Sequence, residues 1–174
     1  MNRLFLSCLF VVSLSGCVSM RHTSSGASGA AEDNQPQHMY TPSEIKWQAG
    51  PPSLLPGAQM AVLEGDPSKP GFFAMRLRFP DGYQVMPHRH PRQERVTIIS
   101  GTLNLGMGDK YDAANVHPLP AGSYSTMPAG MRHFAFAKGV TEIQLATNGP
   151  WTINYVNPAD DPRKAGNQSG AANK

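Results

Sequence analysis

Hydrophobic and polar positions alternate in short runs over residues 59–156 of the chain. The clearest run is 72–79 (FFAMRLRF), in which Phe73, Met75 and Leu77 occupy every second position and arginines fill two of the positions between. Successive side chains of a β-strand point to opposite faces, so this period of two predicts a strand with one buried face. No window of the sequence shows a sustained helical period.

Turns rich in glycine and proline separate the predicted strands. We expect strands at 59–63, 72–79, 83–90, 95–100, 102–107, 122–127, 133–137, 141–147 and 151–156. Gly101 is expected to reverse the chain tightly, because glycine adopts left-handed backbone conformations without a steric cost. We expect 108–120 to be a polar connector. Many short strands joined by such turns predict an all-β sandwich or jelly-roll barrel.

The composition suits one domain with terminal tails. The chain has 174 residues, of which 40% are hydrophobic, and a formal net charge of +3. Nucleic-acid binding calls for a clustered basic stripe with interleaved aromatic residues, and no dense lysine or arginine run is present. We therefore expect no nucleic-acid partner.

The N-terminus has the pattern of an export signal. Arg3 precedes the apolar run 4–14, which is too short to span a bilayer stably. The following Leu-Ser-Gly-Cys resembles the bacterial lipobox, which implies a signal peptide at 1–16, lipidation of Cys17 and a polar tether at 17–38. Because valine follows the cysteine, this resemblance favours the periplasmic side of the outer membrane within the bacterial cell envelope. The alternatives are an ordinary signal peptide or an uncleaved anchor.

The two cysteines of the chain restrict its chemistry. Cys8 lies in the predicted signal peptide and Cys17 would carry lipid. The mature domain would then have no free thiol for a disulfide, a nucleophile or a metal ligand. Any metal ion must be held by nitrogen and oxygen atoms.

A cluster of metal-binding residue types lies at His88, His90 and Glu94. Residues two apart on a strand point to the same face, so both imidazoles can reach one ion. A short turn after His90 can return the Glu94 carboxylate to that ion, and the turn at 128–130 can bring His133 over it. We therefore predict one divalent metal centre of these four side chains. Iron, manganese, nickel, zinc and copper are all compatible with this donor set.

These spacings are similar to the two motifs of the cupin superfamily. The first motif consists of glycine, His-x-His, glutamate and glycine, and the chain matches it at Gly82, His88, His90, Glu94 and Gly101. The second is matched at Gly122, Pro128, Gly130 and His133. Its last position holds Ala137 instead of asparagine, a residue that is not a metal ligand in the family.

The resemblance implies an all-β, single-domain cupin β-barrel, also called a double-stranded β-helix or jelly roll. We expect this domain at 39–158, followed by a polar tail at 159–174. The resemblance is to small single-domain bacterial cupins, with the same four side chains as ligands. Cupins often form homodimers through outer strands, so a homodimer is compatible with it.

The predicted centre has several alternative functions. We expect a metal-dependent enzyme that acts on a small organic molecule, either like a dioxygenase or like an isomerase or lyase, with Glu94 as the catalytic base. The first alternative is a non-catalytic protein that binds a metal or small ligand at the envelope. A second is a metal-sensing module similar to the cupin half of zinc-dependent anti-sigma factors, which the lack of helical periodicity disfavours. Weaker candidates for contact with a ligand are three arginines, Arg92, Arg95 and Arg132. Six aromatic residues that could line a pocket are also weaker candidates: Tyr83, Tyr124, Phe134, Phe136, Trp151 and Tyr155.

Overall fold

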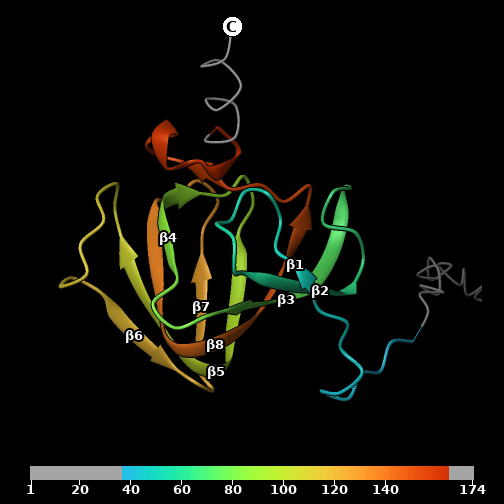
Figure 1. Cartoon of the computed structure of the whole chain (residues 1–174). Coiled ribbons are helices and arrows are strands. Elements are labelled where there is room, and N and C mark those ends of the chain that lie inside the picture. Colours follow the sequence, from blue (N-terminus) through green and yellow to red (C-terminus); the bar gives the residue numbers. More distant parts are fainter. Residues whose placement is uncertain (1–36, 165–174) are drawn as a thin grey trace, which may run out of the picture. The chain divides into compact units, whose positions relative to one another are not determined.

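The computed structural model describes residues 37–164 (Figure 1). The predicted signal peptide, Cys17 and almost all of the tether lie outside the described residues, as does most of the polar tail. Within 37–164, no helix is both long enough and apolar enough to cross a membrane.

Nine β-strands and one 3-10 turn are the regular elements of residues 37–161, and residues 162–164 are helical. The elements are β1 (Gln48–Ala49), β2 (Gln59–Glu64), β3 (Gly71–Phe79), β4 (Gln84–Arg89), β5 (Glu94–Met107), β6 (His117–Pro120), β7 (Tyr124–Met127), β8 (His133–Gly149), β9 (Asn154–Tyr155) and η1 (Pro158–Asp160). The hydrogen-bonded order is β1-β2-β3-β8-β4-β9, and β5 pairs with β6, β7 and β8. The predicted all-β class is confirmed.

The long strand β8 connects the parts of the barrel. Its first part pairs with β4 and its last part with β3, and it pairs with β5 along most of its length. All of these pairings are antiparallel. Figure 1 shows β4, β5 and β8 running side by side around the interior. The end of β4 pairs with the start of β8, with His88 opposite His133, and the start of β5 pairs with β7, with Glu94 opposite Met127. These strand ends carry the candidate site.

One predicted chain reversal and one predicted break between strands are wrong. Gly101 has a φ of 73°, yet β5 continues through it, and the register with β8 shifts on both sides of Ser100. Glycine is needed there because a Cβ atom would lie 2.5 Å from the Val140 carbonyl oxygen of the neighbouring strand. The segments 133–137 and 141–147 likewise join into the single strand β8, which continues through Gly139 at a φ of 72°. Both glycines allow a bulge in a continuous strand instead of a hairpin turn.

Two further strands differ from prediction. β6 lies inside the expected polar connector, where only Leu119 of its four residues is buried, so no alternation was visible. β9 covers only two residues of the strand expected at 151–156. Ala137, which replaces the motif asparagine, is buried and keeps backbone hydrogen bonds with Gly82 and Tyr83.

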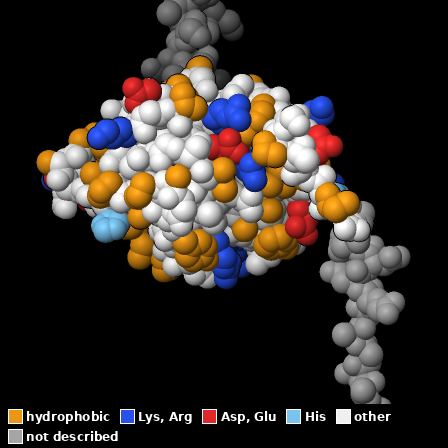
Figure 2. All heavy atoms as spheres, turned by 90° about the horizontal axis from the view of Figure 1, so that it is seen from below, with side chains coloured by type: hydrophobic (Ala, Val, Ile, Leu, Met, Phe, Trp, Pro, Cys, Tyr) orange, Lys and Arg blue, Asp and Glu red, His pale blue; other side chains and the backbone are white. Residues whose placement is uncertain are grey.

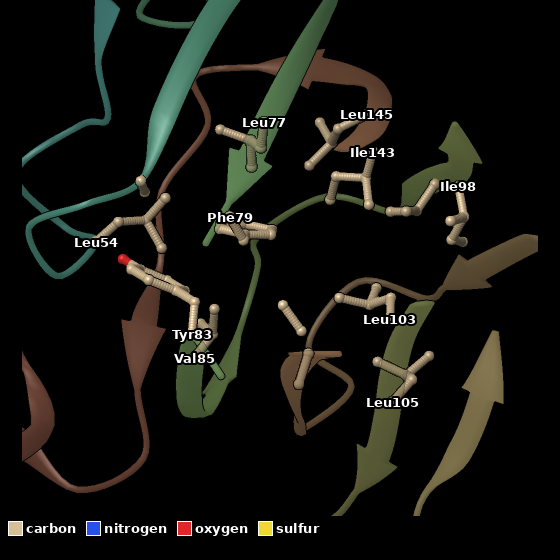
Figure 3. Close-up of a cluster of buried hydrophobic side chains, with 14 of the residues drawn as sticks. Leu54, Leu77, Phe79, Tyr83, Val85, Ile98, Leu103, Leu105, Ile143 and Leu145 are labelled. Carbon is tan, nitrogen blue, oxygen red and sulfur yellow. The ribbon is translucent and has the colours of Figure 1, made fainter. Parts of the chain in front are cut away.

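Hydrophobic side chains fill the interior of the barrel (Figure 3). The alternating residues of β3 that were predicted to share a buried face, Phe73, Met75 and Leu77 among them, are all in this core. Leu105 of β5 and Leu145 of β8 complete it from the facing strands. Burial of each such side chain contributes roughly 1.5–3 kcal/mol to the free energy of folding.

The outer surface shown in Figure 2 is mixed. Hydrophobic side chains lie scattered among polar and charged ones on this face. Isolated exposed hydrophobic residues of this kind are normal for a folded domain. The interior of the barrel is therefore the more informative place to look for a ligand site.

Candidate metal centre

The ends of three neighbouring strands bring the four predicted ligands together. His88 lies near the end of β4 and His90 directly follows that strand, while Glu94 begins β5 and His133 begins β8. In the antiparallel register of β4 and β8, His88 is directly opposite His133. The turn at 128–130 is held to the cluster by a hydrogen bond from the Gly130 N–H to the His90 carbonyl oxygen, at 2.9 Å.

The four side chains are buried and close to one another. One ring nitrogen from each of His88, His90 and His133 lies within 4.8 Å of the other two. The Oε2 atom of Glu94 is 3.2 Å from His90 Nε2 and 4.0 Å from His133 Nε2. A single ion could therefore contact all three rings, with one carboxylate oxygen beside it.

Backbone carbonyl groups orient all three imidazole rings. The Nδ1 atom of His88 is 2.7 Å from the Met86 carbonyl oxygen, and that of His133 is 3.1 Å from the Met131 carbonyl oxygen. His90 Nδ1 is 2.8 Å from the carbonyl oxygen of Thr152. Since a carbonyl oxygen only accepts, each Nδ1 must carry the proton and donate it. In the neutral ring this leaves a free lone pair on every Nε2 atom, as metal binding requires.

Burial sets the charge of these groups. It lowers the pKa of all three histidines, that of His90 to about 3, and neighbouring rings lower the pKa of His88 further. Burial raises the pKa of the Glu94 carboxyl to about 7. The rings are therefore neutral at physiological pH. The nearby lone pairs of His90 Nε2 and Glu94 Oε2 then need a proton or a cation between them.

Trp151 holds the glutamate in place. Its indole Nε1–H donates a hydrogen bond of 2.5 Å to Glu94 Oε1, which leaves Oε2 as the oxygen nearest the histidines. The indole also stacks on the His90 ring, with centroids 5.5 Å apart and an interplanar angle of 15°. The sequence marked Trp151 only as one of several aromatic pocket candidates. A partly buried tryptophan needs a partner for its N–H, but the sequence could not show that Glu94 is that partner.

A cavity of about 50 Å³ lies beside the four side chains. A water molecule needs roughly 10–15 Å³ by this measure, so the space suits a few waters or a small ligand. Apart from the four candidate ligands and Trp151, the residues that line it are hydrophobic, Leu54, Leu105 and Met127 among them.

Among the described residues, no lysine or arginine lines this cavity. The weaker candidates Arg92, Arg95 and Arg132 are therefore outside it, and Arg132 pairs with Asp109 on the surface instead. The cavity thus offers hydrophobic contact and metal-type ligands, but no cationic side chain for an acidic substrate.

The donor set fits a divalent transition metal. Three neutral imidazole nitrogens and one carboxylate oxygen suit zinc, iron, copper, nickel and manganese. These four protein ligands would leave positions on a six-coordinate ion free for water or substrate. His88, His90, His133 and Glu94 could hold such an ion, and Trp151 and the three carbonyl groups would orient them.

Comparison with known proteins supports the fold. A family model described as "Domain of unknown function (DUF4437)" matches residues 69–174. No curated protein matches the chain. Similar solved structures include the polyketide cyclase RemF from Streptomyces resistomycificus, with 14% identity, a TM-score of 0.60, and coverage of 76% of this chain and 94% of that one.

Two further structures extend this comparison. An RmlC-like cupin from Shewanella frigidimarina has 15% identity and a TM-score of 0.51, with 66% of this chain and 92% of that one covered. KdgF from Halomonas sp. has 20% identity and a TM-score of 0.50, with 66% of this chain and 96% of that one covered. The fold is thus the cupin β-barrel that the two motifs predicted.

Proposed function

Because this chain belongs to the family described as domain of unknown function DUF4437 and folds as a cupin β-barrel, we propose that it is a metal-dependent enzyme. Its substrate is a small, largely hydrophobic organic molecule. The ion is held by His88, His90, His133 and Glu94. The observation that carries this proposal is the set of three Nδ1-to-carbonyl contacts, which leave three Nε2 lone pairs free for one ion. The Glu94 Oε2 atom lies beside two of these nitrogens, those of His90 and His133.

A divalent ion in this site supplies Lewis-acid polarisation of a substrate oxygen or, when it is redox-active, chemistry with dioxygen. The chain supplies the base. In the metal-free protein burial raises the pKa of Glu94 to about 7, and when the bond from its Oε2 to the ion loosens, this oxygen can take a proton and return it. Trp151 holds Oε1 by its hydrogen bond and so keeps Oε2 aimed at the cavity. Hydrophobic walls exclude water and strengthen these electrostatic interactions.

The lining of the cavity supports the substrate class. A substrate needs an oxygen group to approach the ion and a small hydrophobic body to fill the remaining space. One similar solved structure belongs to a polyketide cyclase, so this barrel carries enzymatic activity in at least one protein of the same fold.

A turnover assay tests the proposal. Metal-loaded protein is offered catechols, flavonols and 1,3-diketones while oxygen uptake is recorded. A parallel sample without oxygen is followed by NMR for exchange of acidic C–H protons in the diketones. We expect turnover in one of these arms and its loss in His133→Ala. Stoichiometric metal with no turnover in either arm would instead favour the alternative, a non-catalytic protein that binds a metal or small ligand.

We also propose that Cys17 is lipidated and anchors the domain to the bacterial envelope, with the periplasmic side of the outer membrane favoured. The support is the order of charged, apolar and lipobox segments in 1–17. Labelling of cells with a radioactive fatty acid should mark the wild-type chain and leave Cys17→Ser unlabelled. Sedimentation of the purified protein tests whether it forms a homodimer.

A further inference from the structure

A loop between β1 and β2 contributes Leu54 to the lining of the cavity beside the candidate ligands. We call residues 50–58 the strap. Its ends are closed by a hydrogen bond of 2.8 Å from the Gly50 N–H to the Ala58 carbonyl oxygen, and the Leu54 N–H donates to the Pro51 carbonyl oxygen at 2.9 Å. Three prolines within the strap fix backbone φ angles and stiffen it. The strap therefore has a defined conformation of its own.

Two tyrosine hydroxyl groups hold the strap on both sides of Leu54. Tyr155 donates to the Ser53 carbonyl oxygen at 2.7 Å, and Tyr83 donates to the Leu55 carbonyl oxygen at 2.6 Å. Leu55 is 46% exposed, whereas Leu54 is only 5% exposed. These two bonds therefore fix the backbone so that the Leu54 side chain points into the barrel. Figure 3 shows Leu54 beside Tyr83 at the edge of the core, well away from Leu105.

Leu54 borders two separate spaces. On one side is the cavity of about 50 Å³ that contains the candidate metal ligands. On the other is a groove of about 430 Å³ lined by residues 49–52, 54–58 and Pro162. Among the residues described, Leu54 alone lines both spaces.

We propose that Leu54 determines ligand length: its side chain closes the metal cavity against the outer groove, so the site accepts only short hydrophobic molecules. This inference rests on the proposed function, because the ion fixes one end of the ligand and Leu54 limits the other. A shorter side chain at this position joins the cavity to the groove. The same ion can then take a ligand with a longer tail.

The probes are linear alkanohydroxamates of increasing length, from acetohydroxamate upward, which bind the ion with the head group and place an alkyl tail in the cavity. Their affinity for the zinc-loaded full chain is measured by calorimetry. In the wild type, each added methylene should tighten binding about fourfold until the tail reaches Leu54, after which the gain stops. In Leu54→Ala the gain should continue for at least two more methylenes, roughly fifteenfold in total.

Two variants control this experiment. Leu105→Ala removes the same number of atoms as Leu54→Ala, and Leu105 has the same 5% exposure. Leu105 lines the cavity but not the groove, so this variant should allow less increase in the longest alkyl tail that still improves binding. Leu54→Val removes one methylene and disturbs folding less. It should shift the limiting length of the alkyl tail in the same direction as Leu54→Ala.

Two kinds of result would overturn the inference. An unchanged length limit in both Leu54 variants, or an equal extension in Leu105→Ala, refutes the role of Leu54 while the metal site stands. Failure of the wild type to bind even acetohydroxamate refutes both the metal site and the inference. The shortest probe therefore distinguishes the two failures.

Discussion

Replacement of Trp151 by phenylalanine tests how the glutamate ligand is positioned. The change keeps an aromatic ring that can stack on His90 and removes the indole N–H that donates to Glu94 Oε1 at 2.5 Å. Without that donor, the carboxylate of Glu94 can rotate and its Oε2 is no longer fixed beside His90 Nε2. We therefore expect Trp151→Phe to fold normally and to bind divalent metal more weakly.

The strength of the hydrogen bond from Trp151 to Glu94 sets the expected loss of metal affinity. A hydrogen bond to a charged group contributes about 1.5–3 kcal/mol, which corresponds to roughly 10- to 100-fold in metal affinity. The hydrogen bond also lowers the pKa of Glu94, so its loss should raise that pKa above about 7. A proton then competes better with the metal ion for the Glu94 carboxylate. The affinity loss should be larger below neutral pH than above it, where the carboxyl is ionised in both proteins.

The assay is competition for zinc against a chromophoric chelator, repeated across the neutral pH range. Trp47→Phe is the matched control, because Trp47 packs against the Arg78 guanidinium, 3.9 Å from its ring centroid, and does not line the cavity. We expect wild-type affinity in this control. An affinity within twofold of wild type for Trp151→Phe, at every pH, would refute the positioning role.

Three further predictions concern stability. Because the pKa of Glu94 is raised in the folded state, the protonated carboxyl stabilises the metal-free fold below about pH 4.5, and this stabilisation is lost as the pH rises through about 7. The free energy of unfolding of metal-free wild type, compared with that of Glu94→Gln, should therefore fall by on the order of 3 kcal/mol over this range in denaturation experiments. Tyr83→Phe leaves the Leu55 carbonyl oxygen without its donor and should lower the free energy of unfolding by about 1–2 kcal/mol in urea titrations. Gly106→Ala places a Cβ atom against the Phe134 ring and should cost about 1–3 kcal/mol, seen as a lower Tm; an unchanged Tm would contradict the packing.

Local patterns predicted most of the strands and grouped three of the four candidate ligands, because both depend on short-range geometry. The alternation in 72–79 follows directly from the two faces of a strand, and β3 buries the predicted side. The spacing of His88, His90 and Glu94 is short enough for one strand end and one turn to bring them together. His133 was predicted from the turn at 128–130 and from the second cupin motif, and the register of β4 with β8 puts it opposite His88.

Features that depend on long-range contacts could not be predicted in this way. Gly101 looked like a hairpin turn, but the close passage of Val140 on β8 makes it a bulge within β5. The hydrogen bond from Trp151 to Glu94 joins residues 57 positions apart. The inward orientation of Leu54 depends on hydrogen bonds from Tyr83 and Tyr155 to the backbone on either side of it. Each of these contacts exists only once the barrel has closed.

The central claim is that these four side chains hold one metal ion. The most direct test is the metal content of protein purified without chelator, measured by mass spectrometry, for wild type and for the double variant His88→Ala, His133→Ala. His117→Ala is the control, because His117 is exposed on β6 and outside the site. The account predicts one equivalent of a divalent transition metal in wild type and in His117→Ala, and none in the double variant. Wild-type protein without stoichiometric metal, or a double variant that retains it, would contradict the account.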